Sequence, residues 1–432
     1  MTHSSWSKPS VALADFEYEL PADRIAAWPL AQRDRSRLLV CRARTGTLEH
    51  HTFADLPSLL PADALLVVND TRVVRARIVM RKPTGGRVEF FLLEPMAPSH
   101  DPAIALGAHA ESTWRCLVGG ARRVRSISTI THTLPGGETL SAELVDEDAE
   151  GFRVRFRWSG GETFAELLEA AGRVPLPPYI KREAEEQDAE TYQTVYAELA
   201  GSVAAPTAGL HFTPRVHDEL REKGIQTARL TLHVGAGTFR QVKGDRADEH
   251  EMHRERVSVR GATIERLIEH ARRRRDGDGA PFVIVGTTSL RTIESLYWFG
   301  ARLVAGESSE ELSVGQWDPY RLEQTAPVLP DIVEALEAVD RWRADAGLEH
   351  VEGSTGIMIV PGYRVRACDA LVTNFHQPGS TLVLLVGALL GRDLWRSVYD
   401  AALADGYRFL SYGDSSMLVL DDARVSKRNV RD

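Results

Sequence analysis

Two glycine-rich segments that each carry a histidine are the residues of this sequence best suited to chemistry. The first, residues 205–212, contains Thr207 and His211, and the second, residues 232–239, contains His233. Glycine permits tight turns and a close approach of the backbone to a ligand, while imidazole exchanges protons near neutral pH. The pattern is typical of a site that binds a polar small molecule. It is equally typical of two tight turns whose histidines hydrogen-bond to neighbouring carbonyl groups.

A single helix and a single strand must join these two segments. Pro214 begins a stretch with helical periodicity that ends at Gly224, and residues 225–232 then alternate in polarity like a strand. A helix placed in this way brings the chain back along the sheet, so we expect both segments at the same end of the sheet. That end is where open α/β folds bind their ligands.

Four more predicted strands end in polar residues, at 69–72, 287–289, 374–376 and 412–414. Together with the histidine segments, these strand ends could converge on one site. Residues 287–289 also precede a helix predicted over 290–299, and the N-terminus of a helix is suited to a carboxylate or another anion. A helix cap supplied by Thr288 or Ser289 explains the same residues equally well.

Strand-like and helix-like segments alternate over most of the 432 residues, which predicts a large α/β domain. Residues 75–158 differ, because short alternating runs are separated by glycine-rich turns and no convincing helix interrupts them. This pattern predicts a small closed or sandwich-like β domain, inserted into a larger α/β domain of residues 1–74 and 159–432. Residues 301–352 are acidic and poor in strand signal, and we expect them to form a surface excursion with one helix over 332–346.

The composition is that of an ordinary globular protein, with 43% hydrophobic and 26% charged residues. No apolar run approaches the roughly 18 residues needed to cross a bilayer, and three scattered cysteines indicate neither disulfides nor a metal knuckle. We therefore expect a cytoplasmic protein without a membrane partner. The net charge of −9 argues against non-specific coating of nucleic acid, although arginines cluster locally, for example at Arg122, Arg123 and Arg125.

Three familiar kinds of site are disfavoured. The run His250-Glu251-Met252-His253 contains metal ligands, but it lacks the spacing of a zinc hydrolase and no third ligand can be placed. A Ser-His-Asp hydrolase would need a Gly-x-Ser-x-Gly turn, which is missing from the sequence. The Gly235-Ala236-Gly237 run is no dinucleotide fingerprint, because Arg240 stands where the third glycine would be. We therefore expect no metal site.

Several motifs occur in colinear order between Phe16 and Asp414. They include Asn69-Asp70-Thr71-Arg72-Val73, Ala204-Ala205-Pro206-Thr207-Ala208-Gly209-Leu210-His211-Phe212, Leu232-His233-Val234-Gly235-Ala236-Gly237-Thr238-Phe239, Val285-Gly286-Thr287-Thr288-Ser289, Thr373-Asn374-Phe375-His376 and Ser411-Tyr412-Gly413-Asp414. In this order, they resemble the S-adenosylmethionine:tRNA ribosyltransferase-isomerases of queuosine biosynthesis.

The resemblance implies a fold, a reaction and its partners. The fold would be a large α/β domain with a smaller inserted β-barrel domain. The reaction would move the ribosyl group of S-adenosylmethionine to 7-aminomethyl-7-deazaguanine at the tRNA wobble position, giving epoxyqueuosine and releasing adenine and methionine. Such an enzyme needs no cofactor, since S-adenosylmethionine is a substrate. We expect a monomer whose partners are tRNA and S-adenosylmethionine.

The expected ribosyl transfer requires acid–base groups that this sequence contains. A proton must leave the carbon beside the sulfonium, and adenine must gain one as it departs, which are tasks for histidine near neutral pH. Catalytic roles are expected for His211, His233, His253 and Asp414, with His376 as an alternate. Asp414 and Glu251 could favour the sulfonium electrostatically, and an aromatic ring could stack on adenine or face the cation.

Binding roles are expected for residues of the same motifs. The substrate-binding candidates are Arg72, Thr207, Phe212, Gly235, Gly237, Thr238, Phe239, Thr287, Thr288, Ser289, Asn374, His376 and Tyr412. Among them, residues 287–289 would hold the methionine carboxylate. Arg122, Arg123 and Arg125 on the inserted domain are expected to hold tRNA.

Two other classes of protein are consistent with parts of the sequence. One is an RNA-binding relative of this fold with a different or lost activity. The other is an S-adenosylmethionine-dependent methyltransferase, which is disfavoured because no glycine-rich loop follows the first buried strand. Release of adenine distinguishes the three, because methyl transfer leaves S-adenosylhomocysteine and a binding protein makes neither product.

Overall fold

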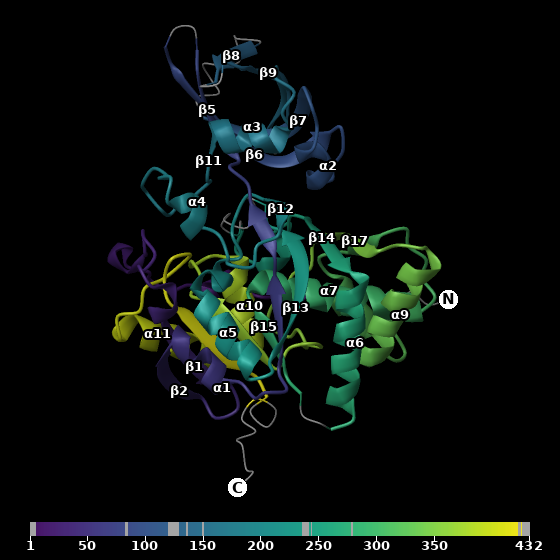
Figure 1. Ribbon diagram of the computed structural model, residues 1–432. Coiled ribbons are helices and arrows are strands. Elements are labelled where there is room, and N and C mark those ends of the chain that lie inside the picture. Colours follow the sequence, from purple (N-terminus) through teal and green to yellow (C-terminus); the bar gives the residue numbers. More distant parts are fainter. Residues whose placement is uncertain are drawn as a thin grey trace.

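A ten-stranded mixed sheet forms the centre of the molecule (Figure 1). The computed structural model describes residues 6–82, 85–119, 129–134, 137–148, 151–235, 242, 244–277, 280–421 and 425. The strands of this sheet are, in spatial order, β16 (Leu312–Val314), β17 (His350–Thr355), β14 (Glu255–Arg260), β13 (Gln226–His233), β3 (Leu65–Asn69), β15 (Phe282–Val285), β18 (Ala370–Asn374), β19 (Ser415–Val419), β1 (Arg37–Arg42) and β2 (Thr47–Thr52).

Four neighbouring strands in the middle of this sheet, β13, β3, β15 and β18, run parallel. Every residue of β3, β15 and β18 is buried, as expected of parallel strands that are covered on both faces. Their carboxyl ends lie at one edge of the sheet, so the polar residues that follow them are brought together there. The coarse prediction of an α/β fold is confirmed.

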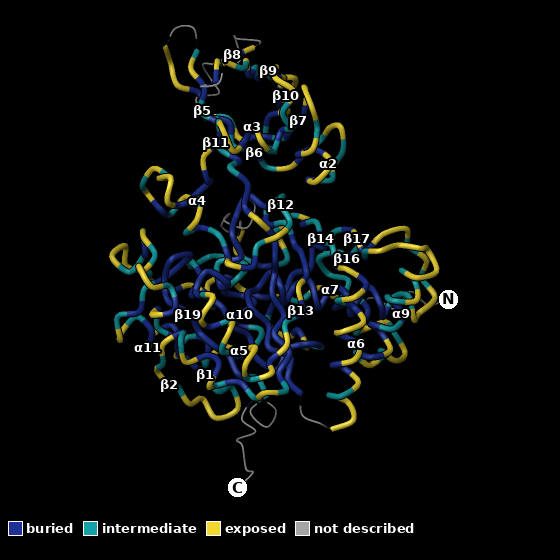
Figure 2. Tube along the Cα trace, in the orientation of Figure 1, coloured by how far each residue is buried: buried dark blue, intermediate teal, exposed yellow. Residues whose placement is uncertain are grey.

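Helices cover both faces of the sheet. Figure 2 shows the result: the chain is buried at the centre of this part of the molecule and exposed around its periphery. Leu65 and Val67 of β3 pack into the cluster that also contains the buried residues of α6 (Gly261–Arg275), α7 (Thr287–Val304), α9 (Ile332–Asp345), α10 (Thr381–Leu390) and α11 (Arg392–Ala404). Leu66 and Val68 point to the opposite face, where they meet residues of α1 (Leu56–Leu59) and α5 (Pro214–Glu222). The helix and strand predicted over 214–232 are confirmed as α5 and β13.

Helix α7 is the most deeply embedded of these helices, because all of its residues from Thr287 to Ala301 are buried. It packs closely on α9: a β-carbon added at Gly300 would lie 2.1 Å from the carbonyl oxygen of Ala335. The prediction that residues 301–352 form a surface excursion was therefore wrong in part. Strand β16 extends the sheet, and the apolar stripe of α9 that includes Val333, Leu336 and Val339 is buried in the core.

A second, seven-stranded antiparallel sheet lies at one end of the molecule (Figure 1). Its strands are, in spatial order, β11 (Gly172–Arg173), β5 (Arg77–Arg81), β6 (Arg87–Ala97), β7 (Glu111–Gly119), β10 (Gly151–Trp158), β9 (Thr139–Asp148) and β8 (Thr129–Thr133). Strands β5 and β8 approach each other, so the sheet is curved. Its concave side holds a separate core that contains Phe90, Trp114 and Phe156.

Two helices pack on this second core. Helix α2 (Pro102–Leu106) interrupts the strands, contrary to the prediction of an uninterrupted β segment, because Asp101 caps a turn that begins with proline. Helix α3 (Phe164–Ala171) begins after Trp158, and its Phe164, Leu167 and Leu168 are part of the same core.

The remaining elements are short. Strands β4 (Thr71–Val73) and β12 (Leu199–Ser202) pair in parallel, and α4 (Asp188–Thr191) and α8 (Asp318–Thr325) are single helical segments. Short 3₁₀ turns occur at Leu13–Phe16, Ala22–Arg24, Arg33–Arg35, Phe53–Asp55, Thr207–His211 and Ala247–Glu249. Within the described part of the chain, no helix has the length and apolar character needed to span a membrane.

The close contact between α7 and α9 predicts that Gly300→Ala destabilises the protein. The added methyl group would collide with the backbone of Ala335, which cannot rotate away, so we expect a loss of about 1–3 kcal/mol. Urea unfolding followed by circular dichroism measures it. Gly86→Ala is the control, since its nearest new contact is a Lys82 side-chain carbon at 3.7 Å. Equal stability of the two variants would contradict this account of the packing.

Candidate active site

A cleft of about 760 Å³ opens at the carboxyl ends of the parallel strands. Its walls come mainly from residues 205–208, the start of α7, the end of β18 with the segment after it, and residues 410–411, and Tyr179 and Val234 complete the lining. The cleft brings together five of the residues predicted from sequence, namely Thr207, Thr287, Thr288, Asn374 and His376. Its mixed polar and apolar lining suits a small organic ligand.

The N-terminus of α7 forms one wall of the cleft. Gly286, with φ of +87°, turns the chain from β15 into the helix, and Gly286, Thr287 and Thr288 line the cleft. Among the described residues, no side chain caps this helix end. The first backbone N–H groups of a helix have no acceptor inside the helix, and its dipole is positive there, so this wall is suited to a carboxylate.

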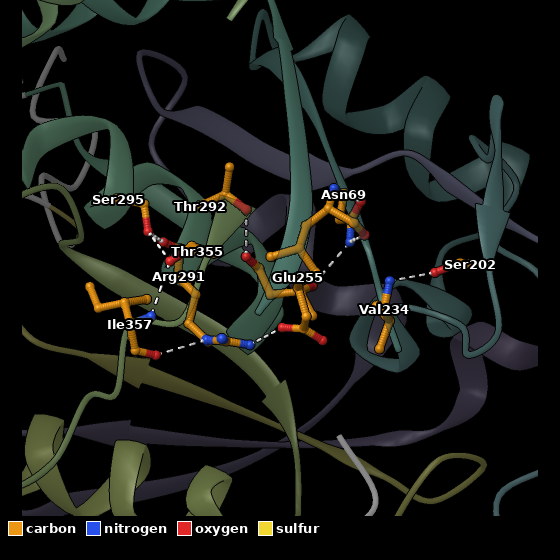
Figure 3. Close-up of polar contacts among 11 residues, drawn as sticks. Asn69, Ser202, Val234, Glu255, Arg291, Thr292, Ser295, Thr355 and Ile357 are labelled. Atoms are coloured by element: carbon orange, nitrogen blue, oxygen red, sulfur yellow. Dashed lines mark hydrogen bonds and ion pairs between the residues drawn. The ribbon is translucent and has the colours of Figure 1, made fainter. Parts of the chain in front are cut away.

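The three hydroxyl groups of this helix start are not equivalent. Ser289 is fully buried and its Oγ donates a hydrogen bond to the carbonyl oxygen of Val285 (2.6 Å). The hydroxyl group of Ser289 is therefore not available to a ligand in the cleft. Thr288 Oγ1 accepts a hydrogen bond from Asn69 Nδ2 (3.2 Å), and Asn69 Nδ2 also donates to the carbonyl oxygen of Leu232 (2.9 Å). Asn69 therefore ties the start of α7 to β13 (Figure 3).

His211 and Asn374 meet behind the cleft with one poorly paired polar atom each. His211 Nδ1 is hydrogen-bonded to Ser36 Oγ (2.8 Å), and Asn374 Nδ2 donates to the carbonyl oxygen of Leu410 (2.9 Å). Both His211 Nε2 and Asn374 Oδ1 are buried, and among the described residues their only interaction is the one between the two side chains themselves, which falls short of good hydrogen-bond geometry. Buried polar atoms are rarely left poorly paired, so a ligand or an ordered water could improve the pairing of either atom.

Burial also sets the protonation of His211. Loss of solvent lowers its pKa to about 4, and the nearby Asp414 carboxylate and the Asn374 side chain oppose this only in part. The imidazole is therefore neutral at pH 7 and able to accept a proton. His376 behaves in the same way: burial lowers its pKa to about 3, and its Nε2 is hydrogen-bonded to Thr373 Oγ1 (2.9 Å).

His233 and His253 lie outside this cleft. Both line a larger hollow of about 1550 Å³, which lies between the second sheet and the start of β14 and which also contains Gly235. His233 Nδ1 is hydrogen-bonded to Thr71 Oγ1 (2.9 Å), and burial lowers its pKa to about 4. Val234 lines both the cleft and the large hollow, so the two adjoin.

Four other predicted residues also lie outside the cleft. Asp414 is buried, and its carboxylate accepts hydrogen bonds from the backbone N–H groups of Arg37 (2.9 Å) and Arg408 (2.8 Å). Tyr412 donates to the Asp188 carboxylate (2.9 Å) and, with His211, lines a small separate hollow. Phe212 is fully buried in the core, and Arg72 is exposed on β4.

The remaining predicted residues fall outside the described part of the chain. These are Gly237, Thr238, Phe239, Arg122, Arg123 and Arg125. Within the described part, no group of three or more histidine, cysteine, aspartate or glutamate side chains could hold a metal ion.

Sequence reasoning missed two features of this region. Tyr179 and Ser411 line the cleft and are hydrogen-bonded to each other (2.6 Å); the proline-rich run before Tyr179 was the only signal that it is held in an irregular segment. The second feature is a buried ion pair between Arg291 of α7 and Glu255 of β14 (Figure 3). These two residues are 36 positions apart, and no local spacing connects them.

Comparison with known proteins identifies the family of this chain. A sequence model of the family described as queuosine biosynthesis protein matches residues 13–419. The chain is 39% identical over 409 residues to an S-adenosylmethionine:tRNA ribosyltransferase-isomerase of Desulfitobacterium hafniense, which covers 94% of this chain and 99% of the relative. It is 40% identical over 410 residues to the protein of the same name from an Anaeromyxobacter species, covering 95% and 99%.

A solved structure is also similar. The crystal structure of an S-adenosylmethionine tRNA ribosyltransferase from Thermotoga maritima aligns over 94% of this chain and 100% of that chain, with 26% sequence identity and a TM-score of 0.44. The match of the family model and the identity to the curated relatives both extend over nearly the whole chain. The protein therefore belongs to the queuosine biosynthesis family of S-adenosylmethionine:tRNA ribosyltransferase-isomerases.

Proposed function

We propose that this protein transfers and isomerises the ribosyl moiety of S-adenosylmethionine onto 7-aminomethyl-7-deazaguanine at the wobble position of tRNA. The products are epoxyqueuosine-tRNA, adenine and methionine. The observation that carries the proposal is the cleft itself, in which the start of α7 faces residues 205–208 and the segment after β18. The extensive identity to relatives that bear this enzyme's name supports the same reaction.

S-adenosylmethionine occupies the cleft in this proposal. The helix N-terminus at Thr287 and Thr288 binds the methionine carboxylate, which the dipole and the free N–H groups favour. Thr207 on the facing wall is available for a hydrogen bond to the ribose, and S-adenosylmethionine is a substrate, so no resident cofactor enters the reaction.

His211 is the acid–base group in this proposal. Its neutral imidazole has a poorly paired Nε2 directed towards Asn374, which lines the cleft. It can accept the proton from the carbon beside the sulfonium and then donate one to departing adenine. Asp414 acts on His211 electrostatically from its position immediately before β19, although residues 412–414 were predicted to follow a strand.

The tRNA approaches through the larger hollow between the two sheets. Three arginines, Arg115, Arg254 and Arg256, line this hollow together with the carboxylates of Glu94, Glu251 and Glu255. Arg115 is paired with Glu94 and Asp148, so contacts to phosphate are left to Arg254 and Arg256. We propose that the second sheet is an inserted domain for holding tRNA, together with Arg122, Arg123 and Arg125. Because α3 and β11 complete its core and its edge, we extend this domain from residue 75 to about residue 173.

A binding protein without activity is not favoured as an alternative. The relatives that match nearly the whole chain bear the name of the enzyme. The expectation of a monomer stays a prediction.

The first test is the reaction itself. Incubation with S-adenosylmethionine and tRNA carrying the deazaguanine precursor should release adenine and methionine in equal amounts, with epoxyqueuosine appearing in the digested tRNA. Chromatography of the supernatant and mass spectrometry of the nucleosides measure both. Transfer RNA with ordinary guanine at the wobble position is the control and should release no adenine. Formation of S-adenosylhomocysteine, or of no product, would refute the proposal.

Replacing the proposed acid–base group should abolish most turnover while leaving the fold intact. For His211→Gln we expect kcat to fall about 10²–10⁴-fold, the usual contribution of general acid–base catalysis. Adenine release under saturating substrate measures it. His270→Gln is the matched control, because His270 is also buried with a pKa lowered to about 4, but it hydrogen-bonds to the carbonyl of Pro281 and does not line the cleft. Full turnover by His211→Gln would exclude its role.

The neutral buried histidines also predict the acid sensitivity of the fold. The pKa values of His211 and His376 are lowered to about 4 and about 3, so the unfolded chain binds their protons first as the pH falls. Stability should be fully present above about pH 6.5 and should decline towards pH 4. Urea unfolding at pH 7.5, 6 and 5 checks this. The decline should be smaller in His270→Gln, which lacks one buried histidine with a lowered pKa. A free energy of unfolding that stays constant from pH 7.5 to 5 would contradict this prediction.

A further inference from the structure

A second hollow adjoins the cleft, with a volume of about 520 Å³ when its open mouth is included. Leu382 lines both spaces, so a single side chain forms part of the wall between them. The second hollow is bounded by Arg291 from α7, Glu255 from the start of β14 and residues 357–359. Any ligand in it would lie next to the proposed S-adenosylmethionine site.

The polar wall of this hollow is the buried ion pair of Arg291 and Glu255 (Figure 3). Arg291 Nη1 donates to Glu255 Oε2, and Arg291 Nε donates to the carbonyl oxygen of Ile357 (3.2 Å). Among the described residues, Arg291 Nη2 has no partner, although the side chain is only 7% exposed. A charged donor buried in this way needs an acceptor, which a ligand in the hollow can provide.

The carboxylate offers the complementary groups. A carboxylate has about four acceptor positions, so Glu255 can accept N–H groups from a ligand in addition to the partners that it already has, among them Arg291. The wall thus presents an acceptor pair directly beside a charged donor. The Watson–Crick edge of a guanine-type base carries the matching set, with N1–H and the 2-amino group beside the O6 carbonyl.

We propose that this hollow binds the 7-aminomethyl-7-deazaguanine base, flipped out of the tRNA, and this rests on the proposed function. Glu255 accepts from N1–H and the 2-amino group, and Arg291 Nη2 donates to O6. Adenine does not fit this wall, because its N1 is an acceptor that would face the carboxylate. The assignment therefore separates the two substrates, with S-adenosylmethionine in the cleft and the base in the hollow.

The rest of the hollow suits the faces of a flat base. Met252, Met358, Ile359 and Leu385 line it, and thioether and aliphatic groups adapt to the surface of a ring. The aminomethyl group is attached to the five-membered ring, away from N1 and the 2-amino group. With the Watson–Crick edge on Glu255, the amine is left free to face the shared wall at Leu382.

The test pairs a change in the protein with a change in the base. Wild-type protein and Glu255→Gln are compared on an anticodon stem-loop RNA that carries either the natural precursor or its analogue without the 2-amino group. We expect the analogue to lower kcat/KM of the wild type about 10–100-fold, as for other bidentate base contacts, and that of Glu255→Gln less than about threefold. The affinity for S-adenosylmethionine, measured by calorimetry, should be the same in both proteins.

Glu352→Gln is the matched control, because this carboxylate is exposed on the neighbouring strand β17. It should discriminate between the two RNAs as the wild type does. Equal discrimination by the wild type and Glu255→Gln would overturn the assignment. Lack of adenine release from wild type with the natural RNA would instead refute the proposed function, so the two failures can be told apart.

A cross-linking experiment on the wild type covers the case in which Glu255→Gln does not fold. RNA carrying the 6-thio form of the precursor is irradiated on the protein, and the modified peptide is identified by mass spectrometry. Because O6 faces Arg291 in this arrangement, we expect the cross-link at Arg291 or in residues 357–359, whose Ile357 carbonyl accepts from Arg291 Nε. A cross-link in residues 205–208 or 374–377, which line the cleft, would contradict the placement of the base.

Discussion

The embedding of helix α7 is the constraint on which the rest of the site depends. Its residues are buried for fifteen consecutive positions between the sheet and α9, a depth that requires a glycine where the two helices touch. Burial of this kind opposes fraying of the first turn of the helix. Its N-terminus therefore stands at a fixed place at the carboxyl edge of the parallel strands, and the site is built around it.

The same burial determines the electrostatics of the site. Water is excluded from the imidazoles of His211 and His376, so both stay neutral at physiological pH. The charges that remain close by are compensated: Asp414 accepts two backbone N–H groups, and Glu255 is paired with Arg291. Such a site presents proton acceptors and fixed dipoles to a cationic sulfonium without placing a competing positive charge on the histidines.

Much of this arrangement could be predicted from the sequence, because strand ends in a parallel sheet share an edge. Thr207, Thr287, Thr288, Asn374 and His376 were expected to meet, and they line one cleft. The helix and strand between the two histidine segments were also identified correctly. What made these predictions possible was local: the periodicity of each segment and the polar residues where it ends.

The errors arose where long-range packing decides the outcome. A polar motif does not reveal which of its side chains faces inwards, so Phe212 of the first histidine segment is in the core and His233 of the second segment lines a different hollow. The acidic composition of residues 301–352 concealed the buried stripe of α9. The pairing of Glu255 with Arg291 depends on how β14 crosses α7, which no single segment encodes.

One consequence of α7 concerns how the chain can change over evolution. Thr287 and Arg291 lie four residues apart on this helix, one turn or about 6 Å along its axis, and they serve two adjoining spaces. The helix therefore fixes the distance between the two spaces. A one-residue insertion within this turn would rotate Arg291 by about 100° away from Glu255, so the length of this stretch cannot drift, whereas surface connections elsewhere can lengthen freely.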